Sequence, residues 1–168
     1  MHRIATRRTF VALPIVALPI VVLVMSACTT APAATGVASA STSESPAPGA
    51  IAVTLQEWAV VPTSTSTAAG DVTFQVTNTG PDDVHEFVVL KTELDAGALP
   101  TDATGTVTEA GSGIEVIGEI EDIAVGDARE LTVTLEAGKY VLLCNIYDET
   151  EKEAHYGMGM RTPFEVTG

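Results

Sequence analysis

The C-terminal part of the sequence brings together residue types whose side chains bind soft metal ions. Cys144, His155 and Met160 all fall in the stretch CNIYDETEKEAHYGMGM. Imidazole suits both oxidation states of copper, thiolate binds both strongly, and thioether sulfur holds Cu(I) while binding Cu(II) weakly. Zinc rarely takes methionine as a ligand, and structural zinc sites usually have more cysteines than this chain provides. The residue types therefore favour a copper site.

Histidine and cysteine are rare in this chain, which has three histidines and two cysteines. His2 and Cys28 belong to the N-terminal targeting segment described below, which leaves His85, His155 and Cys144. A single histidine in a strand is more often structural than a ligand, and a single cysteine is often a small buried hydrophobe. An exported protein, however, seldom keeps an unpaired thiol without a use for it. The joint presence of one cysteine, two histidines and a nearby methionine favours a metal site.

The elements that must position these side chains are predicted to be β-strands. From Ile51 onward, β-branched residues are dense, turn signals recur at short intervals and long amphipathic helical runs are absent. Residues 92–113 are small and polar, so we expect a long connection there, with a short helical turn near residues 92–99. About seven to eight strands indicate an all-β, Greek-key β-sandwich. The expected strands are residues 53–61, 71–77, 84–91, 115–120, 129–135, 139–145 and 163–166.

On these residues the chain resembles the cupredoxins, the family of type 1 or blue copper proteins that includes plastocyanin, azurin and sulfocyanin. In that family a first histidine follows a turn at the start of a strand, as His85 does in PDDVHEF. A second strand ends in a cysteine and is followed by a loop with a histidine and a methionine, as in YVLLCN and HYGMGM. The resemblance covers residues 51–168 and implies a cupredoxin-like sandwich that binds one copper ion. The implied ligands are His85, Cys144, His155 and Met160.

Two methionines compete for the axial position of this implied site. Met160 follows His155 at the interval found in plastocyanin-like members of the family. Met158 follows His155 at a shorter interval, which is closer to that of azurin. We therefore predict Met160 as the axial ligand, keep Met158 as the alternative, and expect the other methionine to pack near the metal as apolar cover.

The sequence departs from the family pattern in two places. Ten residues separate Cys144 from His155, whereas most members have far fewer, and the excess is the charged run DETEKE. Glu86 follows the first histidine, where plastocyanin and azurin have an asparagine that ties the two ligand loops together. Glu86 is thus a candidate residue around the ligands, and we predict that Asn145, next to Cys144, braces the loops in place of the missing asparagine.

The N-terminal segment, residues 1–27, has the features of an export signal. Three arginines precede a short apolar run that contains two prolines, too short for a permanent spanning helix. The stretch TRRTF resembles a twin-arginine signal, and MSAC resembles the lipobox of bacterial lipoproteins, in which the cysteine is acylated. We predict lipidation at Cys28 and a place on the outer face of the bacterial cytoplasmic membrane, with secretion as the alternative. Residues 28–50, rich in Ala, Thr, Ser and Pro, are predicted to be a disordered linker.

The chain is strongly acidic, with a formal net charge of -14 from 22 acidic and 8 basic residues. Such a charge repels nucleic acid and favours a basic partner. Removal of residues 1–27 takes away three arginines and no acidic residue, so the mature chain is more acidic still. The run at residues 148–153 has a simple interpretation as a solvated loop. A sharper hypothesis is that it docks a basic redox partner beside the site.

The resemblance implies a membrane-tethered, monomeric carrier of single electrons whose partner is a redox protein such as a cytochrome or an oxidase. We do not expect an enzyme, because an axial methionine closes the site and the sequence shows neither an acid–base pair nor a further cluster of copper ligands. The alternative is a periplasmic or extracellular copper-handling protein that stores or delivers the metal through the same ligands. A third hypothesis is a metal-free β-sandwich used for adhesion or solute binding.

Overall fold

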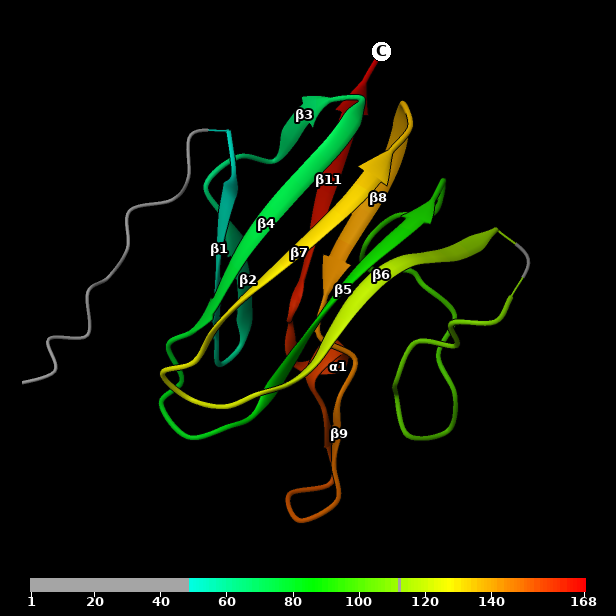
Figure 1. The fold of residues 1–168 in the computed structure, drawn as a ribbon. Helices are drawn as coiled ribbons and strands as arrows, with labels where there is room; N and C mark the ends of the chain where they lie inside the picture. The colour runs from blue at the N-terminus through cyan, green and yellow to red at the C-terminus, as the bar shows by residue number, and fades with distance from the viewer. Residues whose placement is uncertain (1–48, 112) are drawn as a thin grey trace, which may run out of the picture. The chain divides into compact units, whose positions relative to one another are not determined.

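The computed structural model describes residues 49–111 and 113–168 (Figure 1). The predicted export signal, the lipidation site at Cys28 and nearly all of the predicted linker lie outside these residues. Among the described residues, no helix is both long enough and apolar enough to cross a membrane.

The described residues form two packed β-sheets. One sheet has the strand order β2-β1-β4-β7, and the other has the order β3-β11-β8-β5-β6. The pairs β1–β4 and β3–β11 are parallel, and the remaining neighbours within these two sheets are antiparallel. The predicted all-β fold class is therefore confirmed. The strands are β1 (Ile51–Gln56), β2 (Ala59–Pro62), β3 (Ser66–Ala68), β4 (Gly70–Asn78), β5 (His85–Thr92), β6 (Ile114–Ile123), β7 (Ala128–Leu135), β8 (Gly138–Leu143) and β11 (Arg161–Thr167).

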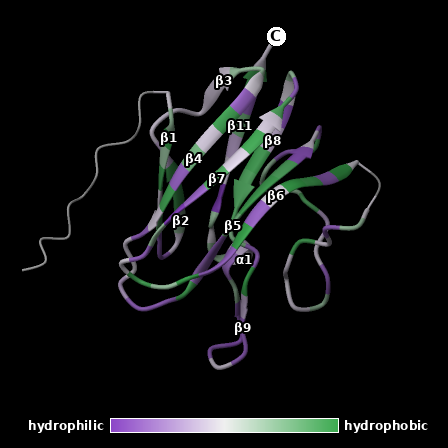
Figure 2. Cartoon of the chain, viewed as in Figure 1, coloured by the Kyte–Doolittle hydropathy of each residue, from purple (hydrophilic) through white to green (hydrophobic). Residues whose placement is uncertain are grey.

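Alternating side chains build the core between the two sheets. In β4, Val72, Phe74 and Val76 are buried, while the residues between them are half-buried. Figure 2 shows bands of different hydropathy along the strands of both sheets. Phe87 of β5 belongs to the same cluster, and its ring centroid lies 5.3 Å from that of Phe74. Because successive side chains of a strand point to opposite faces, this pattern fixes which face of each strand is turned inward.

The two strands next to the predicted ligands, β5, which begins at His85, and β8, which ends before Cys144, are buried on both faces. The connection between β5 and β6 covers the outer face of their sheet, where Leu99 and Val107 of the connection pack against Val88 and Leu143. The hydroxyl of Tyr156 also holds this connection, since it accepts the N–H of Leu99 at 3.1 Å. The scaffold on which the candidate ligands sit is therefore enclosed by apolar side chains from both sides.

Two details of the predicted strand pattern were wrong. Residues 53–61 form not one strand but a hairpin, in which Gln56 pairs with Ala59 and only Glu57 and Trp58 make the turn. The predicted helical turn at residues 92–99 is also absent. The structure has one hydrogen-bonded turn there, from the N–H of Ala98 to the carbonyl of Asp95. A glycine inside this segment and a proline directly after it disfavour a helix.

Candidate metal centre

Three of the predicted ligands come together at one end of the sandwich. His85 is the first residue of β5 and Cys144 directly follows β8, and these antiparallel neighbours bring the two residues to the same end. Nδ1 of His85 lies 3.1 Å from Nδ1 of His155. Sγ of Cys144 lies 3.4 Å from Nδ1 of His155 and 3.9 Å from Nδ1 of His85. All three residues are buried, with exposed fractions of 0 or 1%.

The three donor atoms have the spacing of ligands to one shared ion. With these separations, a single point can lie about 2.0 Å from both Nδ1 atoms and about 2.3 Å from Sγ, which are the lengths of metal–imidazole and metal–thiolate bonds. Among the described residues, Nε2 of His85 and Nε2 of His155 have no hydrogen-bond partner, so neither ring is held by an ordinary pair of hydrogen bonds. Two imidazole nitrogens and one thiolate form a donor set that suits copper. The site therefore fits the metal that the sequence predicted.

The ten residues between Cys144 and His155 do not separate the two side chains. They project from the sandwich as a hairpin of β9 (Tyr147–Asp148) and β10 (Glu153–Ala154) (Figure 1). The N–H of His155 donates to the carbonyl of Ile146 at 2.9 Å, which closes the base of this hairpin. The site thus has a short ligand loop into which a hairpin has been inserted.

The two methionines occupy different environments. Met160 is fully buried in the same cluster as Cys144, whereas the side chain of Met158, on the short helix α1 (His155–Met158), is 43% exposed. The N–H of Cys144 donates to the carbonyl of Met160 at 3.1 Å, and the N–H of Met160 donates to the carbonyl of His155 at 3.1 Å. These bonds attach Met160 to both neighbouring candidate ligands, so burial and connectivity favour it for the axial position.

Glu86 and Asn145 connect the candidate ligands to different parts of the molecule. The N–H of Glu86 donates to Sγ of Cys144 at 3.4 Å, and its carboxylate accepts the N–H of Asn145 at 2.7 Å. Glu86 thereby ties the strand of the first histidine to the end of the cysteine strand. The side chain of Asn145 instead hydrogen-bonds the backbone of Val107 in both directions and donates to the carboxylate of Glu109. Asn145 thus anchors the long connection beside the ligand loop.

Burial controls the protonation of the candidate ligands in the metal-free protein. It raises the pKa of the Cys144 thiol to about 12. It also lowers the pKa of His85, with a further contribution from His155, and it lowers the pKa of His155. For Glu86, burial is again the first cause, and nearby carboxylates add to it, so its pKa rises to about 7. At neutral pH the imidazoles are therefore neutral and the thiol keeps its proton.

Sequence reasoning missed three residues at this end of the molecule. Trp58 packs edge-on against His155, with ring centroids 5.1 Å apart. Glu57 lies behind His85, and Asn78 spans the turn that leads into that histidine. Glu57 and Trp58 form a hairpin turn without glycine, proline or asparagine, so no turn-forming residue marks this turn in the sequence. Asn78 was visible as a turn former in NTGPDD, but its buried hydrogen bonds were not.

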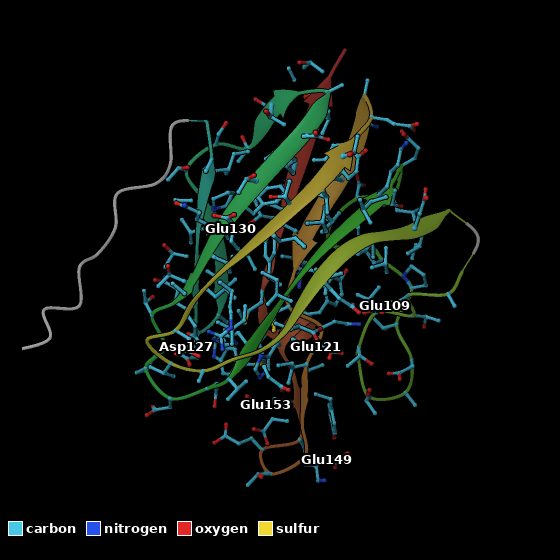
Figure 3. The ribbon with its side chains drawn as sticks, in the orientation of Figure 1. Glu109, Glu121, Asp127, Glu130, Glu149 and Glu153 are labelled. Atoms are coloured by element: carbon cyan, nitrogen blue, oxygen red, sulfur yellow. The ribbon has the colours of Figure 1, made fainter. Side chains whose placement is uncertain are left out.

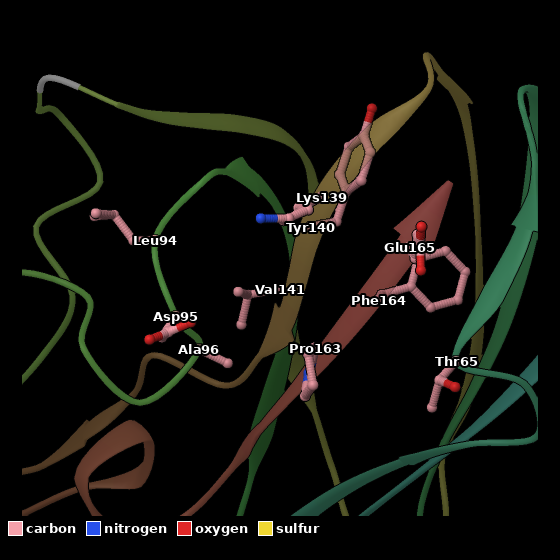
Figure 4. A pocket seen from close by; sticks show the side chains of 10 residues that line it. All are labelled: Thr65, Leu94, Asp95, Ala96, Lys139, Tyr140, Val141, Pro163, Phe164 and Glu165. Atoms are coloured by element: carbon pink, nitrogen blue, oxygen red, sulfur yellow. The ribbon is translucent and has the colours of Figure 1, made fainter. Parts of the chain in front are cut away.

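The cavity in Figure 4 is a different feature. It has a volume of about 420 Å³ and lies against β8, β11 and the start of the long connection. None of the residues that line it is a histidine, cysteine or methionine. The candidate metal centre is therefore a closed cluster of side chains and not part of this cavity.

Known structures share this fold. The structure is similar to that of reduced auracyanin from the photosynthetic bacterium Roseiflexus castenholzii, with 21% identity, 73% of this chain and 100% of that chain covered, and a TM-score of 0.50. It is also similar to auracyanin B, with 21% identity, coverage of 74% and 92%, and a TM-score of 0.51. No protein-family model and no curated protein sequence matches the chain. The similarities show the fold, which is the cupredoxin β-sandwich that the sequence predicted.

Proposed function

We propose that this chain, whose fold is that of the cupredoxins, binds one copper ion and carries single electrons between redox partners. The observation that supports this most directly is the convergence of Nδ1 of His85, Nδ1 of His155 and Sγ of Cys144 on one buried point. Met160 is proposed as the axial ligand because it is buried in the same cluster. Copper bound there would supply a centre that takes up and releases one electron.

The protein's own contribution is to hold the ligands still and to exclude other molecules. His85 and Cys144 are fixed by paired strands, and Met160 is tied to Cys144 through the backbone. Each of the four proposed ligand residues is at most 1% exposed. A substrate or a ligand from another protein cannot reach such a site without opening the fold. Burial therefore favours electron transfer over catalysis and over delivery of copper.

The test of this function is the visible spectrum of the full chain with one equivalent of Cu(II). A strong thiolate-to-copper band should appear, bleach on one-electron reduction and return on reoxidation, with the copper content unchanged throughout. Metal analysis after each half-cycle supplies the second readout. Copper that binds without the band, or that leaves on reduction, would overturn the proposal and support the copper-handling alternative.

Copper affinity is expected to rise with pH. At neutral pH, Cys144 keeps its proton because burial raises its pKa to about 12, while both imidazoles are already neutral. One proton must therefore leave for each copper bound, and the apparent dissociation constant should fall about tenfold per pH unit between about pH 7 and 9. Competition with a copper chelator measures this slope. Cys144→Ser should flatten it, and a flat profile in the unmodified protein would show that the thiol is not a ligand.

The proposed location combines this domain with the export features of the sequence. The twin-arginine-like signal and the lipobox at Cys28 support an exported lipoprotein on the outer face of the cytoplasmic membrane. An acyl group on Cys28 and the 22 residues between it and β1 would then tether a monomeric domain to the membrane. Lipid labelling that disappears in Cys28→Ala is the direct measurement.

The hairpin between Cys144 and His155 is proposed to steer a basic redox partner toward the site. It projects from the sandwich and presents Glu149, which Figure 3 labels, and Glu151. Both residues are exposed. Glu149→Gln with Glu151→Gln should slow reduction by a basic c-type cytochrome about threefold to tenfold at low salt and flatten the salt dependence. The control, Glu130→Gln with Glu165→Gln, removes the same charge elsewhere. Equal rates in the two variants would contradict a docking role for the hairpin.

A further inference from the structure

Glu57 places a carboxylate against the ring of His85, on the side opposite the candidate metal centre. Its Oε1 lies 3.6 Å from Nε2 of His85, and the side chains of Glu57 and His85 are 11% and 0% exposed. Oε2 of Glu57 and Nε2 of His85 are both buried and have no hydrogen-bond partner among the described residues. A buried polar atom without a partner is costly. An unpartnered ring nitrogen and an unpartnered oxygen on two contacting side chains therefore indicate a hydrogen bond that a small side-chain movement completes.

The turn that leads into His85 fixes this carboxylate in place. Oε1 of Glu57 accepts the N–H of Asp83 at 2.8 Å and the N–H of Asp82 at 3.2 Å. Two backbone N–H donors on one oxygen favour the ionised form, which is also the ordinary state of a glutamate at neutral pH. The group that faces His85 is thus a carboxylate. It belongs to the β1–β2 turn, accepts hydrogen bonds from the turn before β5, and contacts the ring of His85.

We propose that Glu57 is a positioning residue for His85. Its carboxylate accepts the proton on Nε2 and so fixes the tautomer in which Nδ1 is free to bind a metal. A neutral imidazole has one proton, and the hydrogen bond on one nitrogen decides which nitrogen keeps it. Nδ1 is the atom that faces His155 and Cys144. In the metal-free protein, His155 is then the donor in the contact between the two Nδ1 atoms.

The charge of Glu57 has a second consequence, which rests on the proposed function. A buried negative charge behind a ligand stabilises the more positive state of the site, so it favours Cu(II) over Cu(I). Glu57 therefore lowers the reduction potential. Its loss shifts the ratio of Cu(I) to Cu(II) affinity toward Cu(I) by about tenfold, which is a rise of the potential by about 59 mV for one electron.

The experiment combines nitrogen NMR of the metal-free chain with voltammetry of the copper-loaded chain. In the unmodified protein, His85 should be the Nε2–H tautomer and His155 the Nδ1–H tautomer. Glu57→Gln keeps one oxygen for the backbone N–H groups and removes the charge, so the His85 tautomers should mix and the potential should rise. The matched control is Glu130→Gln, an exposed carboxylate on β7 (Figure 3), which should change neither readout.

The outcomes separate this inference from the proposed function. A Nδ1–H tautomer of His85 in the unmodified metal-free protein overturns the role of Glu57, and this result needs no variant to fold. An unchanged tautomer and potential in Glu57→Gln overturn it as well. If Glu57→Gln does not fold, Glu57→Asp, which keeps the charge but withdraws the oxygen, is measured in the same way. Absence of the thiolate-to-copper band in the unmodified protein refutes the proposed function, while the tautomer measurement still decides the contact.

Discussion

Replacement of Cys144 by serine is expected to abolish the strong visible band of the copper-loaded protein completely. The band requires a copper–thiolate bond, and a serine hydroxyl is not deprotonated at neutral pH to replace it. Sγ of Cys144 lies 3.4 and 3.9 Å from the two imidazole Nδ1 atoms. Cys144 is also the only cysteine among the described residues, so no other described side chain can supply the thiolate. The measurement is the absorption spectrum with one equivalent of Cu(II).

Two comparisons make the result of Cys144→Ser specific. Cys28→Ser removes the other cysteine of the chain and should leave the band unchanged. The fold of Cys144→Ser should persist, because a serine oxygen can still accept the N–H of Glu86 that now points to sulfur. Far-ultraviolet circular dichroism checks this. A band that survives in Cys144→Ser would exclude Cys144 as a ligand and with it the proposed centre.

The strands that position the site were predictable because their environment is regular. The alternation of Val72, Phe74 and Val76 gave β4 within one residue of its ends. β5 and β8 differ, since both faces are buried and their sequences are nearly continuous apolar runs. Such runs predict burial on both faces, but they do not show what provides the cover. The long connection at residues 93–113 provides it, and only the structure shows that.

The inserted hairpin shows where spacing along the chain misleads. Ten residues between Cys144 and His155 made the loop geometry uncertain from sequence alone. In the structure, a hydrogen bond from the N–H of His155 to the carbonyl of Ile146 closes the hairpin at its base. His155 therefore lies next to Cys144 despite the ten residues between them. β9 and β10 are only two residues long each, which is too short for a hydrophobic pattern to form. No periodicity could have revealed them.

The residues that pack against the candidate ligand side chains were the least predictable part of the site. Glu57 and Trp58 lie about 27 residues before His85 in a stretch that looks like one continuous strand. Their contacts with His85 and His155 depend on a two-residue turn without turn-forming residues and on the packing of two sheets. Side-chain contacts between such distant segments follow from the fold and not from local pattern. The assignment of the four ligands themselves stays a prediction until metal is measured.

Asn78→Ala is expected to be the most destabilising single polar substitution near the site. Asn78 is fully buried, and its Nδ2 donates to the carbonyls of Asp83 and Ile123, each at 2.8 Å. Its Oδ1 accepts the N–H of Gly80 at 2.8 Å. Alanine leaves these three backbone groups without partners. A buried unsatisfied group costs about 1–3 kcal/mol, and the part-buried carbonyl of Asp83 costs less because water can reach it. The free energy of unfolding should therefore fall by about 3–5 kcal/mol.

Urea unfolding of the metal-free protein measures this loss, and Gln75→Ala on the same strand is the matched control. Gln75 is half-buried and should change the free energy of unfolding by about 0.5 kcal/mol or less. Because Asn78 holds the turn that delivers His85, the same substitution should also weaken copper binding, although no ligand is altered. A loss below about 1 kcal/mol would mean that water replaces the amide. The turn before β5 would then be held by Glu57 and the strands alone.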